Sequence, residues 1–243
     1  MKIVVTGGGT GGHFYPVIAV AQEINNIVKE NRLLKPSMYF MSTSPYNEGL
    51  LFENDLKFVK VTSGKIRRSK SLQNFILNFF DLWRIAFGCV SATWKLFVIY
   101  PDVVFGKGGY TSFPALFAAR LLRIPVIIHE SDSKPGMVNK WAGKFAKKIA
   151  ISYPEAGNYF PKDKTAYTGN PVRREIKDVL NTNGKELMNL DPNIPAILIL
   201  GGSQGARFIN NAIIDALPEL VSKYQIIHQT GPTFYNECFH ACI

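Results

Sequence analysis

The chain has 243 residues, of which 47% are hydrophobic and 19% are charged. This composition supports a sizeable core in one large or two modest domains and excludes a disordered chain. The net charge is +10 and is concentrated in residues 57–100, where eight basic side chains stand against one acidic one, so this region is expected to attract phosphate groups of lipid or nucleic acid.

Short apolar runs alternate with helical patterns along the chain. We predict strands at 2–6, 37–41, 58–61, 103–105, 126–129, 148–152, 196–200 and 225–228. We predict helices at 16–29, 72–98, 112–122, 137–146 and 206–221. The alternation predicts an α/β protein with a doubly wound parallel sheet, covered by helices on both faces.

A domain boundary is predicted near Gly169 and Pro171, where the pattern is interrupted and a polar stretch follows. We therefore predict one complete Rossmann-like domain at 1–170 and the start of a second at 171–243. The second segment has too few predicted strands for a doubly wound domain, and we expect the sequence to stop inside it.

Three glycine-rich loops, at 7–12, 106–109 and 201–205, each follow a predicted strand and precede a helix. Such loops let the backbone approach a ligand and turn amide N–H groups toward an anion. The first loop matches the dinucleotide pattern GxGxxG, but the second strand ends in Ser42-Thr43-Ser44 without the acid that would hold a ribose. The loops therefore predict a phosphate-binding site, while a nicotinamide or flavin cofactor is disfavoured.

Titratable side chains follow two of the predicted strands. His13 comes directly after the first glycine loop and is a candidate general base, because imidazole titrates near neutral pH. Glu130 and Asp132 follow the strand at 126–129; they either orient sugar hydroxyls and a catalytic histidine or cap the next helix. Cys238, His240 and Cys242 fit no standard zinc spacing, so no metal site is predicted.

The segment 65–87 pairs a basic run with a wide apolar helical pattern. Its candidate membrane-facing residues are Arg67, Arg68, Phe75, Phe79, Phe80 and Trp83. The pattern fits either a helix facing the core or a helix lying on an anionic membrane surface, and nucleic acid is the less favoured partner. We do not expect a membrane-spanning helix, because Asp81, Arg84 and Lys95 interrupt the apolar windows.

The motifs, taken in order, resemble those of the MurG family, the bacterial transferases that add N-acetylglucosamine to a membrane-bound peptidoglycan precursor. The resemblance rests on Gly8-Gly9-Thr10-Gly11-Gly12-His13, Gly106-Lys107-Gly108-Gly109-Tyr110-Thr111-Ser112, His129-Glu130, Asn139-Lys140-Trp141, Thr168-Gly169-Asn170-Pro171-Val172-Arg173 and Gly201-Gly202-Ser203-Gln204-Gly205-Ala206-Arg207. It covers residues 3 to about 230.

The resemblance implies a fold of GT-B type, with two Rossmann-like domains, and an inverting hexosyltransferase without metal or cofactor. The donor would be UDP-N-acetylglucosamine and the acceptor an undecaprenyl-diphosphate carrying muramyl-pentapeptide, at the cytoplasmic face of the cell membrane. His13 would be the base that activates the 4-hydroxyl of the acceptor sugar. The implied donor contacts are Thr10, Gly11, Gly12, Asp132, Arg173 and Ser203. The implied contacts to the acceptor diphosphate are Gly9, Gly108, Gly109, Tyr110 and Glu130.

Two departures from the family pattern bear on function. Asp132 stands where the family commonly has an asparagine, and a carboxylate next to a diphosphate should repel it. Most donor contacts of the family come from residues beyond the point where this sequence stops, so we expect these 243 residues to bind membrane but to transfer sugar poorly or not at all. Two other functions stay open: a transferase with another lipid acceptor, and a non-catalytic membrane module that binds lipid diphosphate.

Overall fold

The structure is a computed structural model that describes residues 1–67, 71–177, 184–202 and 204–241. The chain forms two compact units, Met1–Lys177 and Asp178–Ile243. Residues 171–177, which the sequence analysis placed at the start of the second domain, pack on the first unit. The backbone N–H of Arg174 donates to Gln22 Oε1 (3.1 Å), and the Arg173 guanidinium lies 4.2 Å from the ring centroid of Tyr15.

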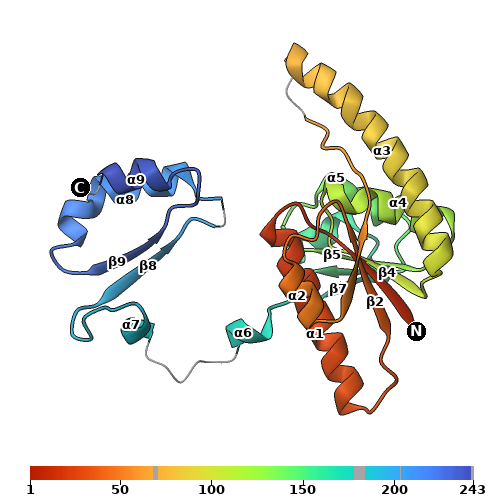
Figure 1. The fold of residues 1–243 in the computed structure, drawn as a ribbon, viewed down its shortest axis with the longest axis horizontal. Helices are drawn as coiled ribbons and strands as arrows, with labels where there is room; N and C mark the ends of the chain where they lie inside the picture. Colours follow the sequence, from red (N-terminus) through yellow and green to blue (C-terminus); the bar gives the residue numbers. More distant parts are fainter. Residues whose placement is uncertain (68–70, 178–183, 203, 242–243) are drawn as a thin grey trace. The chain divides into compact units, whose positions relative to one another are not determined.

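The first unit contains a seven-stranded sheet in the order β3-β2-β1-β4-β5-β6-β7, in which all neighbouring strands are parallel (Figure 1). The strands are β1 Lys2–Thr6, β2 Ser37–Ser42, β3 Leu56–Lys60, β4 Val103–Gly106, β5 Val126–Glu130, β6 Lys148–Ile151 and β7 Thr165–Tyr167. The sequence predicted the first six and missed β7, a three-residue edge strand too short to show a period.

Helices cover both faces of the sheet. Helices α1 (Gly11–Glu30) and α2 (Glu48–Glu53) pack on one face, against β1 residues Ile3 and Val5. Helices α3 (Leu72–Ile99), α4 (Phe113–Leu121) and α5 (Met137–Ala142) cover the other face, toward which Val4 points. The alternation of β1 side chains between the two cores is the period of a strand that is buried on both sides. Short 3-10 segments at Tyr110–Ser112, Pro154–Tyr159 and Lys162–Lys164 complete the connections.

Helix α1 begins at Gly11, earlier than the predicted start at Pro16. The Thr10 carbonyl accepts hydrogen bonds from the backbone N–H groups of His13 (3.2 Å) and Phe14 (3.1 Å), which starts the helix. Pro16 is tolerated inside the helix. As a consequence, His13 lies in the first turn of α1 and not in a loop.

The order of the strands places the first two glycine loops side by side. Strand β1 lies between β2 and β4, so the chain adds strands on one side up to β3 and then returns to the other side. In the register of β1 and β4, Thr6 pairs with Gly106, and the two glycine loops leave this same edge. Open α/β sheets bind their ligands at such a switch point, outside the carboxyl ends of the strands.

The second unit contains two parallel strands, β8 (Ala196–Leu200) and β9 (Gln225–Gln229), joined through helix α8 (Arg207–Leu220). Asn210 of α8 is buried, and its Nδ2 donates to the Thr230 carbonyl (3.0 Å). Helix α7 (Gly184–Leu187) precedes the strands, and α9 (Tyr235–Ala241) occupies a segment for which the sequence showed no clear period. Helix α6 (Arg174–Lys177) ends the first unit.

Candidate functional site

The two glycine loops at the switch point lie against each other, and their glycines leave no room for a side chain. Gly9 has φ +80°, and a Cβ built on it would lie 3.2 Å from Tyr110 Cε1. Gly109 also has φ +80°, and its Cβ would lie 3.3 Å from His13 Nε2. The left-handed backbone at both positions favours glycine. The structure thus brings together His13, Gly9, Gly109 and Tyr110, which the sequence analysis assigned to catalysis and acceptor binding.

The His13 ring is oriented by its own helix turn. Thr10 Oγ1 and His13 Nδ1 are 2.9 Å apart, and the other ring nitrogen lies beside Gly109. When Nδ1–H donates to Thr10 Oγ1, the lone pair of Nε2 is available to accept a proton from a ligand hydroxyl. The geometry therefore gives Thr10, a predicted donor contact, a role in orienting His13.

Three charged groups act on His13. Burial lowers the pKa of its imidazole below the usual value, and the Lys107 ammonium lowers it further. The carboxylates of Asp132 and Glu130 act in the opposite direction and are weaker than burial. A lowered pKa keeps His13 neutral at pH 7, the state that a general base requires.

Lys107 is a member of this cluster that the sequence analysis quoted only as part of a loop. It is 2% exposed, and its Nζ donates to Ser131 Oγ at 2.7 Å. Burial lowers the pKa of its ammonium, while Glu130 and Asp132 raise it. A charged residue between glycines at a switch-point loop is a signal that could have identified Lys107 from the sequence.

Glu130 organises the loop after β5. Its Oε1 accepts from the backbone N–H of Asp132 (3.0 Å), and its Oε2 accepts from the N–H of Gly136 (3.1 Å) and from Asn139 Nδ2 (3.0 Å). These bonds fit the predicted capping role at the start of helix α5, and the implied contact with an acceptor diphosphate stays a prediction. Asp132 is exposed, but its carboxylate acts on His13 and Lys107, so it belongs to the same cluster.

His129 ties the cluster to the end of the first domain. Its Nε2 lies 3.0 Å from the Gly169 carbonyl and 3.3 Å from Ser152 Oγ, and Ser152 Oγ donates to Asn170 Oδ1 at 2.7 Å. Burial lowers the pKa of His129 to about 4, so its ring is neutral at pH 7. His129 therefore holds the motif at 168–173 in place against the sheet.

Two predicted donor contacts distant in sequence, Gly11 and Arg173, lie against one side chain of helix α1. A Cβ on Gly11 would lie 3.0 Å from Tyr15 Cε2. The Arg173 guanidinium lies over the ring of the same Tyr15. Arg173, distant in sequence, thus contacts the same Tyr15 ring that lies against Gly11. Ser203, the remaining predicted donor contact, lies outside the described residues, as do Arg68 and Cys242.

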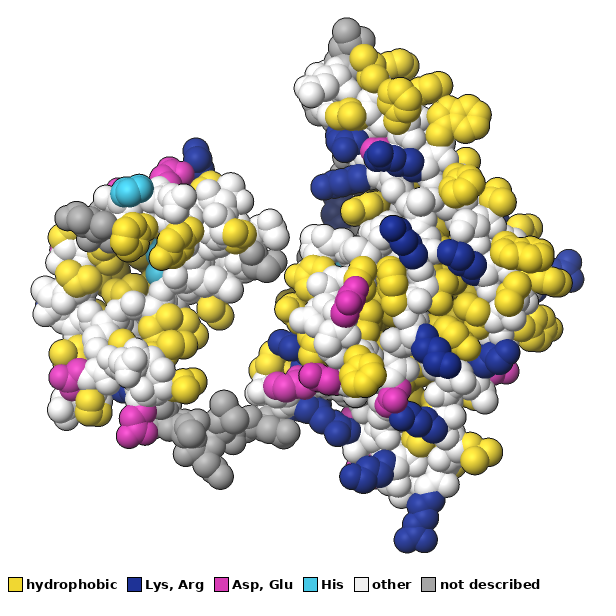
Figure 2. Space-filling view, in the orientation of Figure 1, with side chains coloured by type: hydrophobic (Ala, Val, Ile, Leu, Met, Phe, Trp, Pro, Cys, Tyr) yellow, Lys and Arg dark blue, Asp and Glu magenta, His cyan; other side chains and the backbone are white. Residues whose placement is uncertain are grey.

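Helix α3 exposes a continuous series of large apolar side chains. We call this the α3 apolar surface: Phe75, Phe79, Phe80, Trp83, Phe87, Val90, Trp94 and Phe97, each more than half exposed. Figure 1 shows the first part of α3 extending beyond the sheet, and Figure 2 shows hydrophobic side chains along this helix with Lys and Arg beside them. The sequence left two roles open for this helix, facing the core or lying on a membrane surface. Burial in the core is wrong for these residues.

Helix α3 is strongly apolar although it contains charged residues. By length and composition alone, Gln73–Ile99 is apolar enough to cross a membrane, even with Asp81, Arg84 and Lys95 in it. The expectation that this helix does not span a membrane stays a prediction. Asp81 and Lys95 turn toward the protein, whereas the side chain of Arg84 is 69% exposed. Asp81 is buried and paired with Arg67 (2.6 Å) and Arg84 (3.3 Å), and Lys95 Nζ donates to the Lys60 carbonyl.

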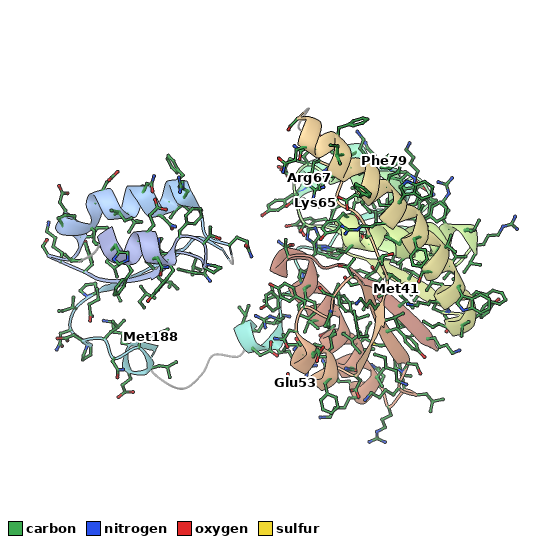
Figure 3. All side chains as sticks on the ribbon, turned by 45° about the horizontal axis from the view of Figure 1, so that its top comes forward. Met41, Glu53, Lys65, Arg67, Phe79 and Met188 are labelled. Carbon is green, nitrogen blue, oxygen red and sulfur yellow. The ribbon has the colours of Figure 1, made fainter. Side chains whose placement is uncertain are left out.

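The segment before α3 lies along the helix and is fixed to it. The backbone N–H of Arg67 donates to Asn78 Oδ1, and Asn78 Nδ2 returns a bond to the Arg67 carbonyl, both at 2.9 Å. Figure 3 shows Lys65 and Arg67 on this segment and Phe79 on the helix. Ser63 Oγ in the same segment donates to the Tyr110 carbonyl (2.7 Å). One segment thus connects the second glycine loop to the α3 apolar surface.

Comparison with known proteins gives the family. Residues 3–151 match the glycosyltransferase family 28 N-terminal domain, and residues 196–239 match its C-terminal domain. The chain is 37% identical over 230 residues to UDP-N-acetylglucosamine--N-acetylmuramyl-(pentapeptide) pyrophosphoryl-undecaprenol N-acetylglucosamine transferase 2 of Bacillus cereus. It is also 38% identical over 230 residues to a Lachnospira eligens protein that has the same name except for the final number 2. In each case 95% of this chain and 62% of the relative are covered, so the chain spans less than two thirds of the length of these relatives.

Solved structures share the fold. MurG of Acinetobacter baumannii has a TM-score of 0.62 and 24% identity, with 99% of this chain and 61% of that chain covered. UDP-GlcNAc 2-epimerase from Neisseria meningitidis, solved bound to UDP-GlcNAc, has a TM-score of 0.61 and 19% identity, with 99% and 69% covered. The predicted α/β fold of GT-B type is confirmed. Since its N-terminal domain alone matches more than half of the residues, this chain belongs to glycosyltransferase family 28.

Proposed function

We propose that this chain carries the acceptor-binding and membrane-binding half of an inverting N-acetylglucosaminyltransferase of peptidoglycan synthesis. The donor is UDP-N-acetylglucosamine, and the acceptor is undecaprenyl-diphospho-muramyl-pentapeptide. The observation that carries the proposal is the position of His13 Nε2 beside Gly109, between two glycine loops at the switch point of the sheet. The names of the relatives, whose length the chain covers in part, support the choice of substrates.

The chemistry follows from the groups at this edge. The 4-hydroxyl of the acceptor sugar attacks C1 of the donor sugar, the C1–O bond to UDP breaks, and the hydroxyl proton passes to His13 Nε2. Thr10 holds the ring so that Nε2 is unprotonated before the reaction, and burial keeps it neutral. The backbone N–H groups of the glycine loops and the start of α1 supply positive potential for a diphosphate.

The membrane side of the proposal rests on helix α3. Exposed apolar patches as long as the α3 apolar surface are unusual on soluble proteins and mark interaction sites. The basic residues Lys65 and Arg67 lie next to it, an arrangement that favours binding to anionic lipid. Helix α3 also packs one side on α4, where a groove of about 810 Å³ is lined by residues such as Cys89, Phe113 and Leu122, and this favours a helix lying on the membrane over one crossing it. We therefore place the protein peripherally at the cytoplasmic face of the membrane that holds the acceptor.

Turnover of a His13→Ala variant tests the proposal. The test uses the chain extended at its C-terminus with the matching region of the Bacillus cereus relative, and measures transfer from labelled UDP-N-acetylglucosamine to acceptor in vesicles. We expect kcat to fall about 10²–10⁴-fold with little change in KM, as for loss of a general base. Thr43→Ala, near the end of β2 but outside the cluster, is the control. Equal kcat in the His13 variant and the parent would remove His13 from the role of base. An inactive parent that still binds acceptor-containing vesicles would favour the non-catalytic lipid-binding function.

A further inference from the structure

One segment of the first unit contacts both helix α3 and the second glycine loop. We call residues 61–67 the connecting segment. Thr62 Oγ1 donates to the Arg84 carbonyl (3.3 Å), and the backbone N–H and carbonyl of Arg67 both bond to the side-chain amide of Asn78 (2.9 Å). The contacted residues of α3 are three or four positions apart and therefore share one face of the helix: Asn78, Asp81, Arg84 and Gly88.

The connecting segment also holds the second glycine loop. Ser63 Oγ donates to the Tyr110 carbonyl at 2.7 Å. Gly109, the residue before Tyr110, faces His13, because a Cβ on Gly109 would lie 3.3 Å from Nε2 of this ring. The position of the loop beside His13 therefore depends in part on a hydrogen bond that starts in the connecting segment.

The α3 apolar surface lies on the face of the helix opposite the connecting segment. At about 3.6 residues per turn, Phe79, Trp83 and Phe87 project on average about half a turn away from the residues that contact the segment. Figure 1 shows the first part of α3 extending beyond the sheet. In this part, the helix carries the connecting segment on one face and exposes large apolar side chains on the other.

The hydrogen bond between Ser63 and Tyr110 lies near the protein surface, since Ser63 is half-buried and Tyr110 is exposed. Such bonds open by local unfolding, at a free energy well below that of global unfolding. A ligand that holds α3 in place reduces the freedom of the groups bonded to this helix, so order gained on one face reaches the segment on the other. Because the segment also bonds to Tyr110, this order extends to the second glycine loop.

We propose that Ser63 is a positioning residue that fixes the second glycine loop beside His13, and that the connecting segment couples this loop to membrane binding by the α3 apolar surface. The inference rests on the membrane binding proposed above and adds a route by which this binding reaches the site. A bilayer that covers the α3 apolar surface holds the helix and the segment together, so the Tyr110 carbonyl stays bonded to Ser63. The loop is then ordered where an acceptor embedded in the membrane arrives.

Hydrogen–deuterium exchange of the backbone amides at 106–112 tests the coupling in the 243-residue chain, with and without vesicles that contain anionic lipid. In the parent chain, saturating vesicles should slow this exchange about threefold or more, because the local opening becomes rarer. Ser63→Ala should bind the vesicles as tightly as the parent but lose the slowing. Ser63→Thr keeps the hydroxyl and should keep the slowing.

Thr165→Ala is the matched control. It removes a bond of the same kind, from Thr165 Oγ1 to the Pro161 carbonyl (2.8 Å), at β7 on the edge of the sheet. Exchange at 106–112 in this variant should respond to vesicles as it does in the parent.

Asn78→Ala provides a second variant, at the other end of the connecting segment. It removes both bonds to Arg67 and leaves the side chain of Ser63 intact. We expect it to lose the vesicle-dependent slowing, as Ser63→Ala does. A purely structural role of Ser63 predicts a different result: Ser63→Ala would exchange faster by the same factor with and without vesicles, and Asn78→Ala would respond normally. Asn78→Ala also keeps the test decisive if Ser63→Ala does not fold.

The outcomes separate this inference from the proposed function. Vesicle binding by the parent without slower exchange at 106–112 would overturn the inference and leave membrane binding standing. Slowing that persists in both Ser63→Ala and Asn78→Ala would also overturn it, because the loop would then respond by another route. A parent that binds no anionic vesicles would overturn the membrane part of the proposed function, and this inference with it.

Discussion

Helices α1 and α3 both carry strongly apolar sequence patterns, but their apolar residues are in opposite environments. In α1, Phe14, Val17 and Ile18 are completely buried against the sheet. In α3, Phe79 and Trp83 are more than half exposed, and only residues nearer its end, such as Ala92 and Leu96, reach the core. The apolar side chains of α3 extend beyond its contact with α4, and those left exposed indicate a second apolar environment.

The contrast also shows what a count of charges cannot reveal. Three charged residues in α3 argued against a membrane-spanning helix, but Asp81 and Lys95 turn toward the protein, so the outer side of the helix stays largely apolar. The side of the helix on which a charged residue lies, and not the number of charged residues, decides whether the exposed surface is apolar. Gly88 allows this arrangement, since a Cβ there would collide with the Thr62 carbonyl of the segment that lies along the helix.

The largest expected effect is the loss of stability on truncating a buried residue of α1. Phe14→Ala should lower the free energy of unfolding by about 3–5 kcal/mol, because it leaves a cavity in a fully packed core. Phe79→Ala on α3 is the matched variant and should change it by less than about 0.5 kcal/mol. Urea unfolding followed by tryptophan fluorescence measures both, since Trp83, Trp94 and Trp141 all report on the first unit. Similar losses for the two variants would contradict the contrast between the helices.

The second effect concerns what covers the α3 apolar surface. Serine at positions 79, 80 and 83 should weaken binding to vesicles containing anionic lipid by about tenfold or more, since burial of each large apolar side chain contributes about 1.5–3 kcal/mol. The unfolding transition should stay where it is. As a control, Leu34→Ser/Phe52→Ser removes exposed apolar residues elsewhere on the first unit and should leave vesicle binding intact. If the triple variant unfolds instead, the surface has a structural role that its exposure does not indicate.

The sequence predicted the fold well because its evidence is local. Short apolar runs identify β1, β2 and β4–β6, and the glycine loops that directly follow β1 and β4 indicate where the backbone must pass close to other groups. Strand β7 has only three residues and half-polar character, so it is defined by pairing with β6 and not by its own pattern. The start of α1 was missed because Pro16 is a strong local signal, whereas the bonds to the Thr10 carbonyl form only in the folded chain.

The site was predicted in part for the same reason. His13 and the glycines of the first two loops could be identified from their order along the chain, because parallel strands end at one edge. The burial of Lys107 and the bonding of Glu130 depend on the packing of segments distant in sequence, among them Asn139, and no spacing rule reports them. The contact between Arg173 and Tyr15 is of the same kind.

The smallest effect separates the charge at the rim of the α3 apolar surface from the surface itself. Arg67→Gln removes one basic group next to this surface and should weaken binding to anionic vesicles by about 1 kcal/mol, or roughly fivefold. The loss should disappear at high salt and on neutral vesicles, because it arises from attraction to the lipid charge.

Lys35→Gln is the matched control: it makes the same charge change at an exposed lysine paired with Asp55, before β2 and away from α3. Arg67 also pairs with Asp81, so a loss that persists on neutral vesicles would instead mean that the ion pair holds the segment against the helix. Equal losses for the two variants would show that total charge, and not its position beside an apolar surface, controls the attraction to membranes.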